Sequence, residues 1–130
     1  MSSIFTKIIR GEIPCYKIAE NKHCFAFLDI RPNTPGHTLV VPKKEVDKIT
    51  DLDEDSYREL MAFSHKIARA LDRSMDAKRV AMAVVGLEVP HVHVHLIPID
   101  KMSDMDFSHS IDMTPGQFES IARRIRKELE

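Results

Sequence analysis

The stretch His91-Val92-His93-Val94-His95-Leu96-Ile97 places a histidine at every second position, and an apolar residue follows each one. Successive side chains of a β-strand point to opposite faces of a sheet, so we expect the three histidines to share one face and Val92, Val94 and Leu96 the other. Side chains two positions apart lie roughly 7 Å from each other along such a face. The stretch therefore predicts a strand with one apolar face and one histidine face.

Three imidazoles on one strand face are compatible with three roles. They are typical zinc ligands. Alternatively, one neutral imidazole attacks phosphorus while the others donate hydrogen bonds. In the third interpretation they are structural, with no ligand or with their ring nitrogens satisfied internally. His37 and Glu88 are the best candidates for a further zinc ligand, and neither has a recognisable ligand spacing. Gly86 is the only glycine between Gly36 and the histidines, so a phosphate would be held by imidazoles and strand-edge amides rather than by a glycine-rich loop.

Apolar periodicity and turn residues predict further elements on both sides of this stretch. Upstream we expect a helix over 4–9, strands over 16–19 and 24–30, a strand over 37–41, a helix with the stripe Leu60, Phe63, Ile67 and Leu71, and a strand over 80–85. Asp51 or Asp53 can cap the long helix. Downstream we expect a loop over 100–113 and a helix that starts with the capping box Thr114-Pro115-Gly116-Gln117.

The order of these elements predicts the fold class. Consecutive strands joined by short turns indicate an α+β fold, an antiparallel sheet of about five strands with two main helices on one face. The 130 residues suit a single domain, 1–130. An edge strand of such a sheet has unpaired backbone groups, so we expect it to pair with a second copy in a homodimer.

Composition narrows the classes of partner. With 19 basic and 20 acidic residues, the formal net charge is −1, so we expect no nucleic-acid partner. The sequence contains no apolar run near the length of a membrane span, so we expect no membrane association. Cys15 and Cys24 do not form a disulfide framework, which favours a reduced, cytoplasmic location.

Two further blocks of sequence accompany the histidines. The first comprises Ile4-Phe5, Lys7-Ile8-Ile9-Arg10 and Glu12-Ile13-Pro14; the second comprises 25–30, Pro32 and 35–44. Together with 91–97 they resemble the histidine-triad superfamily, and the first block is similar to the amino-terminal motif of its nucleoside phosphoramidase branch. The blocks extend over most of the chain, from Ile4 to Pro98. The resemblance makes zinc the minor alternative.

This resemblance implies a role for each histidine of the motif. His93 is expected to be the nucleophile that attacks the α-phosphorus of a purine nucleotide or nucleotide conjugate. His37 and His91 are expected to orient its ring, and His95 to face the phosphate oxygens or the leaving group. The resemblance also implies a homodimer whose two sheets join, and a reaction that needs neither a metal nor another cofactor.

The resemblance implies a nucleotide site beside these histidines. Asp29 is expected to bind the ribose hydroxyls; on residue type alone it could instead cap the turn that follows it. An apolar slot for the base is expected from Phe5, Ile8, Ile13, Phe27 and Ile30, although each could equally be a core residue. Gly86 retains one glycine of the family's phosphate-contacting turn.

The sequence departs from the phosphoramidase branch just before the histidines. Leu87 stands where a glutamine is expected, Glu88 where a hydroxyl residue often contacts phosphate, and Pro90 lacks a backbone donor. Glu45 also replaces a histidine that is common after the Pro-Lys-Lys run. The leading hypothesis is a phosphoramidase that forms a covalent nucleotidyl-histidine. The alternatives are a dinucleoside polyphosphate hydrolase, a nucleotide-binding module without turnover, and a zinc-dependent hydrolase.

Overall fold

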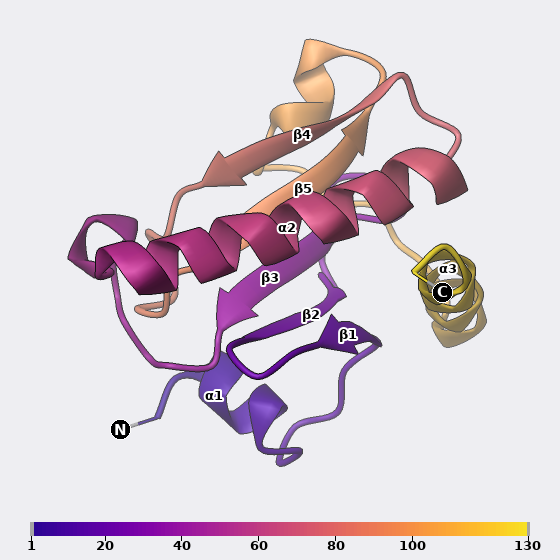
Figure 1. Cartoon of the computed structure of the whole chain (residues 1–130). Coiled ribbons are helices and arrows are strands. Elements are labelled where there is room, and N and C mark those ends of the chain that lie inside the picture. Colours follow the sequence, from indigo (N-terminus) through magenta and orange to yellow (C-terminus); the bar gives the residue numbers. More distant parts are fainter. Residues whose placement is uncertain (1, 130) are drawn as a thin grey trace.

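Five strands form one antiparallel sheet in the computed structural model, which describes residues 2–129 (Figure 1). They are β1 (Lys17–Glu20), β2 (Cys24–Leu28), β3 (Thr38–Pro42), β4 (Arg79–Val84) and β5 (Val94–Ile99). Their order across the sheet is β1-β2-β3-β5-β4, so β3 and β5 are neighbours although a long helix and β4 separate them in the chain. The expected α+β class with an antiparallel sheet is confirmed.

Three α-helices accompany the sheet: α1 (Ile4–Ile9), α2 (Glu54–Ser74) and α3 (Pro115–Lys127). Asp53 caps α2 by accepting a hydrogen bond from the Ser56 amide. Thr114 and Gln117 form the expected capping box of α3. Helix α2 runs along one face of the sheet, and α3 packs beside it against β1 (Figure 1).

The main core lies between the sheet and helices α2 and α3. Alternate strand residues, among them Ala26, Val40 and Val94, point to this side and are fully buried. They meet the stripe of α2, represented by Leu60 and Ile67, and the buried face of α3. Burial of a Leu or Ile side chain stabilises a fold by about 1.5–3 kcal/mol, so this face of the sheet holds most of the apolar stabilisation.

The opposite face of the sheet carries a second apolar cluster around α1. It consists of Phe5, Ile8, Phe25, Phe27, Leu39 and Val41. The two main helices cover the first face, as expected, whereas the short helix α1 lies on the second. Every residue of β2 and β3 is buried, so both faces of these two strands require cover, and α1 supplies it on the second face.

The histidine stretch is only partly a strand. β5 begins at Val94, whereas the alternation of sequence predicted a strand from His91 onward. The His91 amide donates to the Val89 carbonyl (2.8 Å) and the Val92 amide to the Val46 carbonyl (2.7 Å), so these residues do not extend the ladder to β3. Alternation nevertheless persists, because Val92, Val94 and Leu96 all enter the main core.

The predicted loop over 100–113 contains one short 3-10 helix, Met102–Met105. The Asp104 carboxylate holds its first turn by accepting hydrogen bonds from the amides of Asp100 (2.8 Å) and Lys101 (3.1 Å). Among residues 2–129, no helix combines the length and the apolar character that crossing a membrane requires.

Candidate functional site

The four histidines of the motif gather on the sheet face opposite α2. His95 lies on β5 directly beside Leu39 of β3, and His37 immediately precedes β3. All four side chains are buried, with relative exposures of 1% for His37, 0% for His91, 7% for His93 and 8% for His95. The structure therefore brings His37 together with the three histidines of the 91–95 stretch.

The ring of His93 has a defined proton position. Its Nδ1 lies 2.8 Å from the carbonyl oxygen of His91. A carbonyl oxygen only accepts, so Nδ1 carries the proton and donates it. In the neutral ring Nε2 then has the lone pair, and within the described residues it has no hydrogen-bond partner. His93 thus presents a nucleophilic nitrogen from a ring that the backbone holds in place.

His37 and His95 form a second chain of directed hydrogen bonds. The Asn33 amide donates to Nδ1 of His37 (2.9 Å), so the proton of a neutral His37 ring is on Nε2. That Nε2 lies 2.9 Å from Nδ1 of His95 and donates to it. His95 in turn carries its own proton on Nε2. Through these two hydrogen bonds, the Asn33 amide determines that the proton of neutral His95 is on Nε2, which is then available as an N–H donor.

Burial keeps both rings of this chain uncharged at neutral pH. Loss of water around His37, with smaller effects of His95 and His93, lowers its pKa to about 3. Burial, reinforced by His93, lowers the pKa of His95 to about 4. Both histidines are therefore neutral donors rather than cations near pH 7.

His93 lies between an aromatic side and a polar side. The ring of Phe5 meets it edge-on at a centroid distance of 4.9 Å, and the ring of His95 lies at 4.9 Å in a similar T-shaped arrangement. Beyond His95, the half-exposed ring of Phe107 lies 4.7 Å from His95 and 6.2 Å from His37. A group bound at Nε2 of His93 would thus have apolar surface on one side and a hydrogen-bond donor on the other.

The apolar residues expected to bind a base divide into two groups. Phe5, Ile8 and Phe27 are buried in the cluster under α1, with Phe5 and Phe27 rings 5.6 Å apart, and Ile13 packs against that cluster. Ile30 lies outside it and is 67% exposed. The buried members support the fold whatever else they do, whereas Ile30 is available for contact.

Asp29 follows β2, and the sequence left two roles open for it, capping of the next turn and binding of the ribose hydroxyls. Its Oδ1 accepts a hydrogen bond from the Arg31 amide (2.9 Å), which caps the turn. Its Oδ2 lies 3.6 Å from Nε2 of His37, on the histidine side. Burial raises the pKa of this carboxyl, and the Arg31 amide partly opposes that effect.

Asp29, His37 and His95 are also the one group of potential metal ligands that residues 2–129 bring together, with ligand atoms within 4.8 Å of one another. The hydrogen bonds argue against a cation there. Because Nδ1 of His37 accepts from Asn33, its Nε2 keeps a proton and offers no lone pair. Nδ1 of His95 already uses its lone pair to accept that proton. A metal would have to displace both hydrogen bonds.

The segment that departs from the family pattern, residues 86–90, immediately precedes His91, and its Val89 packs against the apolar cluster around α1. Gly86 has φ = +73°, a left-handed conformation that favours glycine in this turn. Leu87 is 90% exposed, and Glu88 is also exposed. Among smaller effects, the charge of Glu88 contributes to the raised pKa of Asp29.

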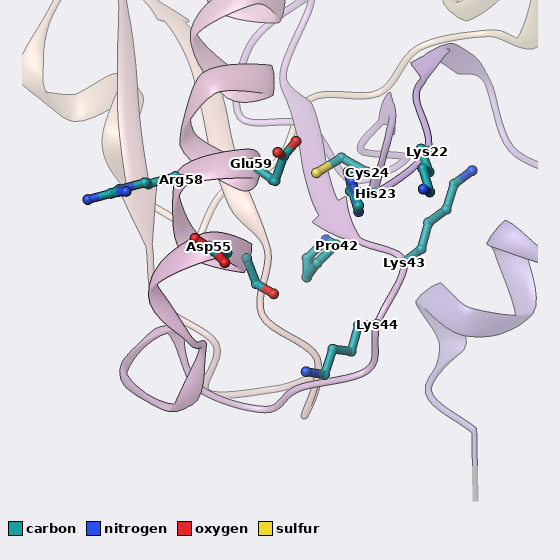
Figure 2. Close-up of a pocket in the computed structure, with 10 residues that line it drawn as sticks. Lys22, His23, Cys24, Pro42, Lys43, Lys44, Asp55, Arg58 and Glu59 are labelled. Atoms are coloured by element: carbon teal, nitrogen blue, oxygen red, sulfur yellow. The ribbon is translucent and has the colours of Figure 1, made fainter.

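A separate hollow of about 570 Å³ lies at the other end of β3, between the β1–β2 turn and the first turns of α2 (Figure 2). Its lining includes His23, Lys43, Lys44, Asp55 and Arg58. Lys43 forms an ion pair with Glu20 (2.7 Å), and Lys44 with Asp53 (3.5 Å). None of the four motif histidines lines this hollow, so it is distinct from the candidate site.

Sequence reasoning did not identify three residues that contact the histidines. They are Ser3, whose hydroxyl meets Nδ1 of His91 at 2.7 Å, Asn33, and Phe107. Asn33 acts through its backbone amide, for which side-chain type gives no signal. Phe107 could have been noticed as a lone aromatic residue in an otherwise aperiodic loop.

The fold and the site together define a histidine-triad protein: an antiparallel sheet presents a free imidazole nitrogen between an apolar cluster and a neutral histidine donor. A family model described as the HIT domain matches residues 10–102, and the chain belongs to this family.

Curated relatives agree with this membership. The chain is 37% identical over 99 residues to an adenosine 5'-monophosphoramidase of Schizosaccharomyces pombe, a match that covers 75% of this chain and 74% of that protein. It is 39% identical over 98 residues to an adenosine 5'-monophosphoramidase of Saccharomyces cerevisiae, a match that covers 73% of this chain and 61% of that protein.

Solved structures show the same fold. A Hit-like protein from Bartonella henselae has a TM-score of 0.85 at 31% identity, over 98% of this chain and 96% of that one. A zinc-bound histidine triad family protein from Mycobacterium smegmatis has a TM-score of 0.82 at 31% identity, over 99% and 94%.

Proposed function

We propose that this protein hydrolyses purine nucleoside phosphoramidates or related adenylylated compounds at the α-phosphate. The observation that carries the proposal is the free Nε2 of His93, whose ring is held by the 2.8 Å bond from Nδ1 to the His91 carbonyl. An imidazole with one nitrogen anchored and the other unprotonated is prepared for nucleophilic attack. Relatives that are named adenosine 5'-monophosphoramidases support the choice of substrate class.

The proposed reaction has two displacements at phosphorus. In the first, the lone pair of His93 Nε2 forms a bond to the α-phosphorus, and the P–N bond to the leaving amine breaks. The amine takes a proton from solvent as it departs. In the second, a water oxygen attacks phosphorus, the bond to Nε2 breaks, a proton returns to solvent, and AMP is released. Throughout both steps Nε2–H of His95 donates to a phosphate oxygen, where charge develops.

The nucleotide would extend from His93 toward α1. Phe5, Ile8 and Phe27, with Ile13 packed against them, form the apolar cluster on that side. Ile30 and Gly86 would complete the nucleotide site. The Oδ2 atom of Asp29 would accept from ribose hydroxyls while Oδ1 retains the Arg31 amide. His37 would act by donating to the His95 ring, and His91 by accepting from the His93 ring through its carbonyl oxygen.

AMP release from adenosine 5'-phosphoramidate, with a chelator present, tests the proposal. The parent is expected to release AMP, and His93→Ala to lose activity while it retains the fold. His65→Ala, on the exposed side of α2, is the matched control and should keep parent activity. Quenching the reaction in alkali, in which a P–N bond to imidazole survives, followed by mass spectrometry should reveal an adenylyl group on the parent chain. Equal turnover by parent and His93→Ala would remove His93 from the mechanism.

Glu88 favours one alternative, nucleotide binding without efficient turnover. Its charge contributes to the raised pKa of Asp29, and a carboxylate here would repel a phosphate that approached closely. Glu88→Ser should then raise turnover of the phosphoramidate, whereas tight AMP binding with no turnover in either protein would favour the binding module. Comparing the rates for the phosphoramidate and for diadenosine polyphosphates tests the alternative that the protein is a dinucleoside polyphosphate hydrolase.

We also propose that two copies associate through β4. Within residues 2–129 this strand forms one edge of the sheet and pairs with β5 alone. Met82 on β4 is 44% exposed and Val85 just beyond it is 49% exposed, so the edge presents apolar side chains as well as backbone groups. Light scattering of the parent and of Met82→Lys would test this, with a dimer expected only for the parent.

A further inference from the structure

The N-terminal segment reaches directly into the histidine site. The hydroxyl oxygen of Ser3 lies 2.7 Å from Nδ1 of His91, although 88 positions separate the two residues. Both side chains are buried, Ser3 at 7% and His91 at 0% relative exposure. A hydroxyl placed against a buried ring nitrogen is a specific contact, because solvent cannot replace it there.

The direction of this hydrogen bond follows from the other side of the ring. Nε2 of His91 lies 2.8 Å from the carbonyl oxygen of Pro42, which can only accept, so Nε2 carries the proton. Burial lowers the pKa of His91, which favours the neutral ring. Nδ1 is therefore an acceptor, and Ser3 donates its hydroxyl proton to it. The same oxygen accepts from the Thr6 amide (3.0 Å) as the N-cap of α1.

Glu45 holds Ser3 in this position. Its Oε1 accepts from the Ser3 amide (2.7 Å) and from the Thr6 hydroxyl (2.6 Å). These two hydrogen bonds, the one from the Ser3 amide first, lower the pKa of the Glu45 carboxyl to about 2, so it is ionised at neutral pH. Glu45 follows β3, which ends in Pro42. The segment 42–45 therefore supplies the Pro42 carbonyl at one side of the His91 ring and holds Ser3 at the other.

We propose that Ser3, held by Glu45, is a positioning residue for the nucleophile. Ser3 fixes the orientation and the proton of the His91 ring, and the carbonyl of His91 fixes the proton of His93. The contact also joins the site to α1, which carries Phe5 against the His93 ring. The consequence for catalysis rests on the proposed function of His93, whereas the consequence for the His91 ring does not.

The first test is NMR of the ring nitrogens in protein labelled with ¹⁵N-histidine. Protonated and lone-pair nitrogens have distinct shifts, so the parent should show His91 with its proton on Nε2 and a hydrogen-bonded Nδ1. Ser3→Ala should shift the Nδ1 signal of His91 or mix its tautomers, and Ser3→Thr, which retains a hydroxyl, should restore the parent pattern. An unchanged His91 signal in a folded Ser3→Ala protein would overturn the proposal.

Loss of a helix cap must be separated from loss of the ring contact. Thr114→Ala provides the matched control, since Thr114 caps α3 through the same kind of hydroxyl bond and does not contact the histidines. It should lower stability as Ser3→Ala does and leave the His91 signals and the turnover unchanged. Glu45→Ala should move the His91 signals in the same direction as Ser3→Ala.

Turnover of the phosphoramidate is the second readout. Ser3→Ala is expected to lower kcat by about tenfold to a hundredfold, by analogy with the loss caused by removing the hydrogen-bond partner of a metal-ligating histidine, with a smaller change in KM. Recovery in Ser3→Thr is expected. Equal kcat in Ser3→Ala and parent would overturn the positioning role. If the parent itself has no turnover, the proposed function fails and the NMR result still decides whether Ser3 controls the His91 ring.

Discussion

Nε2 of His37 lies 2.9 Å from Nδ1 of His95, so two residues 58 positions apart share one directed hydrogen bond. The Asn33 amide sets its direction at one end, and the donor it creates on His95 points away at the other. The position of a proton on His95 is thus decided by a loop that precedes β3.

Replacement of His37 should therefore act through His95. In His37→Ala the acceptor Nδ1 of His95 loses its partner, and we expect kcat/KM to fall by about tenfold to a hundredfold. His37→Gln, whose amide can donate from a similar position, should recover part of the loss. Steady-state kinetics with circular dichroism as a folding check would measure this. Parent activity in a folded His37→Ala protein would contradict the role of the His37–His95 bond.

Acid should destabilise the fold through the same two rings. Burial lowers the pKa of His37 to about 3 and of His95 to about 4, whereas in the unfolded chain both titrate near the ordinary value of 6.5. Between these limits the unfolded state binds more protons, so the free energy of unfolding falls as pH is lowered below about 6.5. Urea unfolding at several pH values would show this, and His37→Gln should reduce the slope.

Gly36, next to His37, is expected to tolerate no side chain. Its φ is +92°, and a Cβ there would lie 2.7 Å from Sδ of Met75 and 3.2 Å from Cγ of Pro98. Gly36→Ala should lower the free energy of unfolding by more than the roughly 1–2 kcal/mol that left-handed backbone alone costs.

Gly11→Ala is the matched control for this substitution. Gly11 has φ = +79°, and a Cβ there would meet nothing within 4 Å. Denaturant unfolding of both variants separates backbone strain from the close contact with Met75. Equal destabilisation by the two substitutions would show that the contact at Gly36 relaxes without cost.

Asp29→Asn should separate ribose binding from turn capping. Asparagine retains an oxygen for the Arg31 amide, so the turn and the stability should be preserved. The charged acceptor for ribose is lost, and we expect KM for an adenosine phosphoramidate to rise by about tenfold to a hundredfold, because loss of a charge-assisted hydrogen bond costs about 1.5–3 kcal/mol. A 2',3'-dideoxy substrate should show no difference between the two proteins. A similar rise in KM for both substrates would assign Asp29 to the turn alone.

Local sequence determined the elements and their faces. The alternation of Val92, Val94 and Leu96 with histidine places the valines and the leucine in the main core and the imidazoles on the other face, because a strand has a period of two. Capping residues such as Asp53 and Thr114 determined where helices begin, since they bond amides only three positions ahead. These are short-range interactions that a reader of the sequence can recognise.

Tertiary structure alone decided the proton positions and the placement of α1. The tautomers of His37, His91 and His93 depend on Asn33, Pro42 and a neighbouring carbonyl, which are backbone groups without a sequence signature. The contact of Ser3 with His91 joins residues 88 positions apart, and it exists because α1 covers the second apolar face of β2 and β3. Sequence therefore determined which imidazoles share a face, whereas long-range packing decided which of their nitrogens can react.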